Sequence, residues 1–442
     1  MEARRIAFEI LMTVITEDAY SNEALAGALA EKELPAADKA LVRELVYGTL
    51  THYKLLKYWL KPYFQGRVKE WVKVLLAMTL YQTTYLEKIP HYAAVDEAVK
   101  LAHARGGDFN AKTVNAVLRN VLAQDLRSFD EMEEGANRLA VETSHPTWLV
   151  RLWEAQFGLP RTVAMLKANN ARPPLMLRTN ITQISKAQLK ARLEREGVKL
   201  SDAALVSTAL TVEAGNPVAT ESFEQGLFYI QDEASMLVAL ALSPAKGAAV
   251  LDVCAAPGGK SFHLAEQVGA DGVVYAHDVS PYKIARIKEN AERLKVANVK
   301  PKLGDAHALD QFYERESFDY ILVDAPCSGL GIVRRHPEAK MRKRPEQLDE
   351  IVQVQKEILA HAAAFLKPGG RLVYSTCTVN RKENHRQIEG FLNENQNFSF
   401  DEGFEARMPA ALNGHFEDGM LQLFPQDFNT DGFFIAAIVK DK

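Results

Sequence analysis

The stretch from Gly247 onward limits the possible fold most, because short apolar runs alternate there with helical patterns. The helical patterns cover residues 283–294 and 351–365. Apolar runs stand around them at residues 249–253, 273–278, 320–324 and 371–375. Near-continuous apolar strands separated by helices are typical of a parallel sheet covered on both faces. We therefore expect an α/β domain here, and we expect residues 432–440 to pair at the end of its sheet.

The first 124 residues show a helical pattern without strand alternation. Apolar and other inward-facing side chains recur at offsets of three, four and seven, as in Val42, Leu45, Val46, Thr49, Tyr53, Leu56 and Leu60. Helix breakers interrupt the series at Pro35, Pro62, Pro90 and Gly106-Gly107. This pattern predicts a compact all-α domain over residues 1–130.

The section between these two regions has a mixed pattern. Strands are predicted at 175–180, 211–213 and 228–230, and a helix capped by Ser185 follows the first of them. A small α+β module over residues 140–235 fits this pattern, and it leaves residues 236–442 for the α/β domain.

The composition of the 442 residues, 47% hydrophobic and 25% charged, excludes a disordered chain, a fibre and a coiled coil. No apolar run approaches the about 18–20 residues of a membrane span, and Glu9 interrupts the N-terminal stretch that could resemble a signal peptide. The three cysteines are too few for a disulfide framework and form no CxxC pair for structural zinc. We expect a cytoplasmic monomer that needs neither a metal nor a membrane.

A loop of small residues follows the first apolar run of the α/β domain. Residues 254–261 read Cys-Ala-Ala-Pro-Gly-Gly-Lys-Ser and lead into a helix, whose N-terminus offers free N–H groups to a ligand. A Walker A loop would need glycine in place of Cys254, and the GxGxxG motif of dinucleotide-binding loops is absent. A tight turn without a ligand remains an alternative for this loop.

Acidic residues close the next strands. Asp278, Asp305 and Asp324 stand at or just after successive predicted strand ends. Each alone is a common cap or turn residue, but open α/β sheets bind ligands at the edge where such ends meet, and a carboxylate there often accepts ribose hydroxyls. Adenosine is the predicted ligand.

Two cysteines lie in the loops after two of these strands. Cys327 follows the Asp324 strand, and Cys377 lies 50 residues further on, after the next predicted strand. A lone cysteine is usually a small buried apolar residue, but neighbouring strands would bring both thiols to one rim beside an acid. Such a rim suits methylation of cytosine C5, in which a thiolate adds to C6 and an acid assists at N3. These residues do not indicate which thiol is the nucleophile.

Three segments resemble the signature motifs of RNA cytosine-C5 methyltransferases: residues 252–260 (DVCAAPGGK), 324–329 (DAPCSG) and 374–378 (YSTCT). The sequence Arg334-Arg335-His336-Pro337 and the helical N-terminal section are similar to the small-subunit rRNA methyltransferase B group, which carries a NusB-like domain. The resemblance implies a Rossmann-like methyltransferase domain, S-adenosyl-L-methionine as cofactor and 16S rRNA as substrate.

The resemblance also implies roles for single residues. Cys377 would attack C6, and Cys327 would assist release of the methylated product. Asp324 would bond the cytosine edge near N3 and border the methionine end of the cofactor. The residues implied to bind the cofactor are Cys254, Ala255, Ala256, Pro257, Gly258, Gly259, Lys260, Asp278 at the ribose, Asp305 at the adenine, and Asp324.

A basic tract follows Cys327 although the net charge of the chain is −4. Its members are Arg334, Arg335, His336, Lys340, Arg342, Lys343 and Arg344. A solvated loop is the usual explanation of such a cluster. Beside a cytosine-modifying site, we expect phosphate contacts that flank the target base, which must be unpaired or flipped and so favours a loop in structured RNA.

Two other functions remain open. A DNA cytosine-C5 methyltransferase would use the Pro-Cys thiol of Cys327 as its nucleophile. An RNA-binding assembly factor without activity would have no reason to keep Asp324, both thiols and the glycine loop together.

Overall fold

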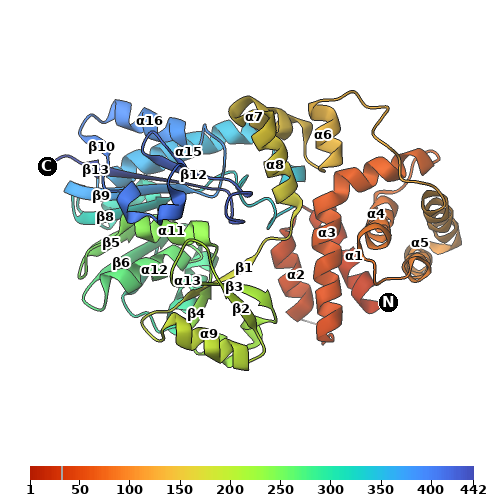
Figure 1. Cartoon of the computed structure of the whole chain (residues 1–442), viewed down its shortest axis with the longest axis horizontal. Coiled ribbons are helices and arrows are strands. Elements are labelled where there is room, and N and C mark those ends of the chain that lie inside the picture. Colours follow the sequence, from red (N-terminus) through yellow and green to blue (C-terminus); the bar gives the residue numbers. More distant parts are fainter. Residues whose placement is uncertain (31–32) are drawn as a thin grey trace. The chain divides into compact units, whose positions relative to one another are not determined.

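The computed structural model describes residues 1–30 and 33–442, and its chain divides into two compact units. The helical unit comprises residues 1–172 and 333–343, and the sheet unit comprises residues 173–332 and 344–442. Figure 1 shows the helices of the first and the sheets of the second. The segment 333–343 therefore leaves the sheet unit in sequence and folds with the N-terminal helices.

The helical unit is built from α-helices, and the apolar faces of the first five form one core. They are α1 (Glu2–Thr16), α2 (Ser21–Ala30), α3 (Ala36–Leu60), α4 (Glu70–Tyr85), α5 (His91–Leu122), α6 (Ala136–Glu142), α7 (Thr147–Phe157), α8 (Leu159–Asn170) and α14 (Ala339–Arg342). The predicted apolar face of α3, from Val42 to Leu60, is buried. The predicted break at Gly106-Gly107 is a kink inside α5, where Gly107 adopts a φ of 70°.

The helical unit reaches further along the chain than the predicted all-α domain. Helices α7 and α8 cluster with it, and the unit ends at Arg172 rather than near residue 130. Ser144 explains part of this attachment, because its Oγ accepts a hydrogen bond from the Lys54 backbone N–H at 3.0 Å.

The small module contains an antiparallel sheet in the order β2-β3-β1-β4. Its elements are β1 (Leu175–Thr179), α9 (Lys186–Arg195), β2 (Lys199–Asp202), β3 (Ala209–Ala214), α10 (Glu221–Glu224) and β4 (Phe228–Ile230). Helix α9 begins with the predicted Ser185 cap, which forms a capping box with Gln188. Strand β2 was not predicted, because its four residues carry little apolar alternation.

The larger sheet has the order β11-β12-β13-β9-β8-β5-β6-β7, and β10 pairs with β13. Its parallel strands are β5 (Ala249–Asp252), β6 (Val273–Asp278), β7 (Val299–Leu303), β8 (Phe318–Asp324) and β9 (Leu366–Thr376). Its antiparallel strands are β10 (Phe398–Phe400), β11 (Phe416–Glu417), β12 (Met420–Leu423) and β13 (Phe433–Lys440). The helices of this domain are α11 (Glu233–Leu242), α12 (Gly259–Val268), α13 (Pro281–Leu294), α15 (Pro345–Ala363) and α16 (His385–Glu394).

The prediction that the last apolar run ends the sheet is wrong. Strand β13 lies between β9 and β12, so it is an interior strand. Pairing on both sides explains why Phe433 to Ile438 are all buried.

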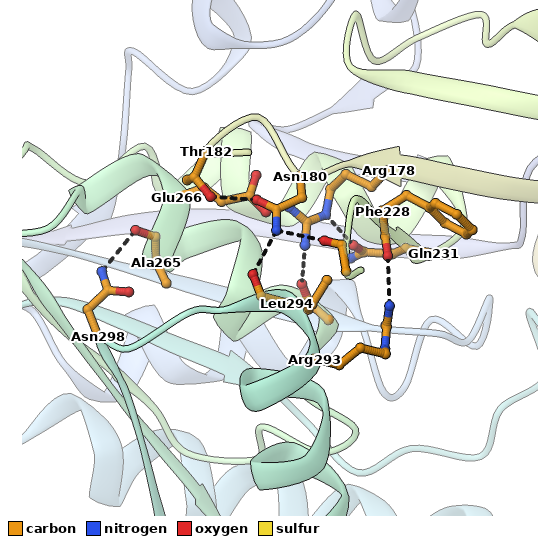
Figure 2. Close-up of polar contacts among 12 residues, drawn as sticks. Arg178, Asn180, Thr182, Phe228, Gln231, Ala265, Glu266, Arg293, Leu294 and Asn298 are labelled. Atoms are coloured by element: carbon orange, nitrogen blue, oxygen red, sulfur yellow. Dashed lines mark hydrogen bonds and ion pairs between the residues drawn. The ribbon is translucent and has the colours of Figure 1, made fainter. Parts of the chain in front are cut away.

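Buried polar contacts join the small module to the domain of the larger sheet, as Figure 2 shows. Arg178 on β1 forms an ion pair with Glu266 on α12 and donates to the Gln231 side chain at 2.9 Å. The Asn180 amide donates to the carbonyls of Gly226 and Leu294, at 2.9 Å each. Because these groups are buried, their directional hydrogen bonds fix the position of the small module on the sheet domain.

Among the residues that the structure describes, no helix is both long and apolar enough to cross a bilayer.

Candidate active site

The carboxyl ends of β8 and β9 place two thiols together. The strands are parallel neighbours, and Asp324 at the end of β8 pairs in register with Ser375 on β9. The Sγ atoms of Cys327 and Cys377 lie 3.2 Å apart in the loops that follow. The expectation that neighbouring strands would bring both thiols to one rim is therefore confirmed.

The contact between the thiols makes their protonation interdependent. The hydrogen bond with Cys377 and burial raise the pKa of Cys327 well above that of a free thiol. Two thiolates at this distance would repel each other, so ionisation of one sulfur holds the proton on the other.

Asp324, at the end of β8, is bonded to Ser375 on the neighbouring strand β9 and to Lys260 in the first turn of α12. Its Oδ2 accepts a hydrogen bond from Lys260 Nζ at 2.7 Å, and its Oδ1 accepts one from Ser375 Oγ at 2.7 Å. Burial disfavours the charge on Lys260, but the charges of Asp324 and Cys377 outweigh it and raise the pKa of the ammonium. Ser375 was not among the predicted site residues, although its place in the YSTCT segment directly after Tyr374 could have indicated it.

The loop at 254–261 requires glycine at two positions. Gly258 adopts a φ of 101°, and a Cβ there would lie 2.7 Å from the Phe262 ring. A Cβ on Gly259 would lie 2.8 Å from the ring of Tyr229, whose hydroxyl donates to the Pro257 carbonyl at 3.3 Å. Tyr229 on β4 of the small module thus supports the loop, a contact that no local sequence pattern indicated.

Three carboxylates near this loop differ in environment. Asp278 is buried, and its Oδ1 accepts the Ser280 N–H at 3.0 Å. Asp305 is exposed and caps the short helix after β7, where the N–H and side chain of His307 lower its pKa. Asp252, which was not predicted, is fully buried, and burial raises its pKa to about 7.

These groups fit a nucleoside that carries an amino acid. The glycine-rich loop offers the N-terminus of α12, and Asp278 offers a buried carboxylate for hydroxyl donors. Asp252 Oδ2 accepts a hydrogen bond from Ser261 Oγ at 2.6 Å, which ties the first turn of α12 to the end of β5 beside the loop. Cys254 is partly buried against the same core, and burial raises its pKa.

The basic tract is placed differently from the expectation. Arg334 to Lys343 belong to the helical unit, and Arg344 alone of the tract belongs to the sheet unit. Lys340 is buried, and its Nζ donates to Thr51 O at 2.8 Å and Asn170 Oδ1 at 3.0 Å. The ammonium of Lys340 is thus enclosed by protein, and this arrangement does not favour the predicted phosphate contact.

Other members of the tract also have protein partners. Arg334 is buried, and Arg342 donates to the carbonyls of Val14 and Ala19 at 2.6 and 2.5 Å. The side chain of Arg344 is exposed.

The described residues hold no group of three or more His, Cys, Asp or Glu side chains that could bind a metal ion.

Comparisons with known proteins cover nearly the whole chain. Residues 239–439 match the family described as 16S rRNA methyltransferase RsmB/F, residues 1–123 match the NusB family, and residues 145–219 match the RsmF/B-like ferredoxin-like domain. A "Probable ribosomal RNA small subunit methyltransferase B" of Bacillus subtilis is 41% identical over 99% of this chain and 98% of its own length. The chain belongs to the RsmB/F family of 16S rRNA methyltransferases.

Other relatives and solved structures agree with this family. The ribosomal RNA small subunit methyltransferase B of Vibrio vulnificus is 34% identical over 100% of both chains. A crystal structure titled PH0851 aligns with a TM-score of 0.83 and 25% identity over 100% of this chain and 99% of that chain. A methyltransferase homologue from Pyrococcus horikoshii has a TM-score of 0.59 and 26% identity over 70% of this chain and 100% of that one.

Membership confirms several predictions at once. The chain is an enzyme, an rRNA methyltransferase with S-adenosyl-L-methionine as its cofactor. Its fold is the predicted series of a NusB-like helical domain, a small α+β module and a Rossmann-like methyltransferase domain.

Proposed function

We propose that this RsmB/F-family chain methylates C5 of an unpaired cytosine in 16S rRNA through a covalent bond between Cys377 Sγ and C6 of the base. The observation that carries the proposal is the pair of thiols 3.2 Å apart at the ends of adjacent parallel strands. C5 of cytosine is a poor nucleophile, and addition of a thiolate to C6 makes C5 an enamine carbon. The second thiol, that of Cys327, is available to assist release of the methylated product.

The residues around the thiols support each step of this reaction. Cys377 Sγ bonds to C6 while the carboxyl group of Asp324 gives a proton to N3, and the Lys260 ammonium on Asp324 Oδ2 stabilises the carboxylate that remains. S-adenosyl-L-methionine supplies the methyl group for C5 as a sulfonium. A base then removes the C5 proton, the C6–S bond breaks as the C5–C6 double bond re-forms, and the thiolate of Cys377 is regenerated.

The division of work between the thiols follows the family resemblance and has physical support. The raised pKa of Cys327 keeps a proton on that sulfur when Cys377 ionises. Cys377 is then the nucleophile, and Cys327 assists release of the product.

The remaining assignments are part of the same proposal. The loop at 254–260 wraps the cofactor, Asp278 holds its ribose, and Asp305 lies by its adenine. The NusB-like domain over residues 1–130 and the small module over residues 140–235 bind the RNA, and residues 236–442 carry the chemistry.

Mechanism-based trapping tests the proposal. The protein and S-adenosyl-L-methionine are incubated with 16S rRNA transcribed with 5-fluorocytosine, whose fluorine blocks removal of the C5 substituent, and the crosslinked cysteine is mapped by mass spectrometry. We expect an adduct on Cys377 that is lost in Cys377→Ala and kept in Cys327→Ala. An adduct on Cys327 would indicate the arrangement of the DNA enzymes, and methylated RNA without any adduct would contradict the covalent mechanism.

A further inference from the structure

We propose that Glu383 is a positioning residue that fixes the two thiol loops against each other, so that Cys327 can act on the adduct formed by Cys377. The inference rests on the proposed function for its catalytic consequence.

Glu383 lies just before α16 and is fully buried. Its Oε2 accepts hydrogen bonds from the Ser328 backbone N–H at 2.8 Å and from Gln355 Nε2 at 3.1 Å. Its Oε1 accepts from Ser328 Oγ at 2.6 Å and from Asn380 Nδ2 at 3.0 Å. Thr378 Oγ1 makes a longer contact of 3.5 Å with the same Oε1, so two donors face Oε2 and three face Oε1.

The donors come from both thiol loops. Ser328 directly follows Cys327, and Asn380 lies three residues after Cys377. A direct bond of 2.8 Å between Ser328 Oγ and Thr378 Oγ1 closes the same arrangement. Glu383 thus links the loop after β8 to the loop after β9 at the residues next to the sulfurs.

A third element supports the link from behind. Gln355 on α15 donates from the same Nε2 to the Pro326 carbonyl at 2.9 Å, and its Oε1 accepts from Gln387 on α16 at 3.2 Å. Pro326, just before Cys327, is therefore bonded to Gln355, and Ser328, just after it, is bonded to Glu383. Gln355 also donates to Glu383, so one network holds both neighbours of Cys327. A buried network with its members satisfied is rigid, and rigid support keeps reacting groups in place.

The network needs a carboxylate rather than an amide. Each oxygen of Glu383 faces at least two donors, so the –NH₂ group of a glutamine would face at least two donors in either orientation. Glu383→Gln keeps the size of the side chain and removes acceptors from one side. The loops should separate or become mobile, while the fold of the domain is retained.

Oxidation of the thiol pair tests the geometry without reference to methylation. Diamide converts two thiols to a disulfide and is itself reduced to the hydrazine, and a sulfur separation of 3.2 Å favours rapid closure in the native enzyme. We expect formation of the Cys327–Cys377 disulfide, identified by peptide mapping, to slow at least about tenfold in Glu383→Gln. Glu389→Gln, an exposed change on α16 just after Glu383, is the matched control, and its disulfide should form as fast as that of the native protein.

Methyl transfer on native 16S rRNA tests the catalytic consequence. We expect Glu383→Gln to lower kcat at unchanged KM for S-adenosyl-L-methionine and to accumulate the Cys377–RNA adduct on ordinary cytosine, as Cys327→Ala would. Glu383→Asp keeps both oxygens and should restore part of both the closure rate and kcat. If Glu383→Gln is unfolded by circular dichroism, Asn380→Ala, which removes a single donor, takes its place in both assays.

The outcomes separate this inference from the proposed function. A native enzyme that never forms an adduct would overturn the covalent mechanism, and the disulfide comparison would still decide the geometric role of Glu383. A folded Glu383→Gln that matches Glu389→Gln in closure rate and in kcat would overturn the role of Glu383.

Discussion

Arg178 and Lys340 are both buried basic side chains, but their partners differ. Arg178 is 1% exposed and forms an ion pair with Glu266, which holds the small module to the methyltransferase domain (Figure 2). Lys340 is 3% exposed, and its ammonium donates to a backbone carbonyl and an amide oxygen in the helical unit. One buried cation is neutralised by a carboxylate, and the other is bonded to neutral oxygens.

This difference changes how each contact responds to pH. A guanidinium keeps its proton throughout the physiological range, and a carboxylate partner compensates its charge. Burial without such compensation lowers the pKa of Lys340 to about 7. Burial raises the pKa of Glu266, so the ion pair made by Arg178 loses its compensating charge as the pH falls, whereas the contact made by Lys340 changes its charge near neutrality.

The largest expected effect is on the compensated pair. Arg178→Gln or Glu266→Gln leaves one buried charge without its partner, which typically costs about 3–5 kcal/mol of unfolding free energy. The measurement is urea unfolding of the two single variants and of the Arg178→Met/Glu266→Leu double variant. We expect the double variant to be more stable than either single one, because no charge remains buried.

A double variant whose loss equals the sum of the two single losses would show that the pair is not coupled. In that case Glu266 would not compensate the charge of Arg178, and the contrast between Arg178 and Lys340 would be lost.

The sequence could indicate residues that follow strands but not residues buried by distant partners. Asp324, Cys327 and Cys377 were found because parallel strands bring their carboxyl ends to one edge. Lys340 was expected to contact RNA, and nothing local could show that its ammonium meets Thr51, 289 residues earlier in the chain. A charge in a sequence does not reveal whether water or protein surrounds it.

The same limit applies to other parts of the fold and the site. The predicted helices and parallel strands carry apolar periodicity of their own, whereas β2, β11 and β12 are two to four residues long and are defined by the strands that pair with them. The role of Glu383 depends on hydrogen-bond donors from the two thiol loops and from α15, which come together only in the folded chain.

The next effect in size is the pH dependence of stability caused by Lys340. Its folded pKa of about 7 lies below the usual value of 10.5, so between these values the unfolded state binds more protons than the folded state. Stability must then rise with pH in this window, by up to about 1.4 kcal/mol per pH unit, and this contribution is absent below pH 7, where both states hold the proton. Lys340→Met should remove that slope in denaturant unfolding from pH 7 to pH 10.

Lys54 and Lys57 also have pKa values lowered by burial, so the native slope contains their contributions. The decisive quantity is the difference in slope between the native protein and Lys340→Met, with Lys343→Met in the same segment as the control. Equal slopes in all three proteins would mean that Lys340 keeps its proton in the folded state, and the contrast with Arg178 would disappear.

The smallest expected effect separates exposed from buried members of the basic tract. A side chain that contacts a phosphate releases a counterion on binding, so its loss lowers the slope of log K against log salt by about 0.7 for single-stranded nucleic acid. Arg344 is exposed and Lys340 is enclosed.

We expect Arg344→Gln to lower the salt slope of 16S rRNA binding by about this amount, and we expect Lys340→Met to leave the slope unchanged. Both variants are measured at pH 6.5, where the native Lys340 is mostly protonated. A lower slope in Lys340→Met would mean that its ammonium reaches RNA after all, and an unchanged slope in Arg344→Gln would remove the exposed end of the tract from the RNA contact.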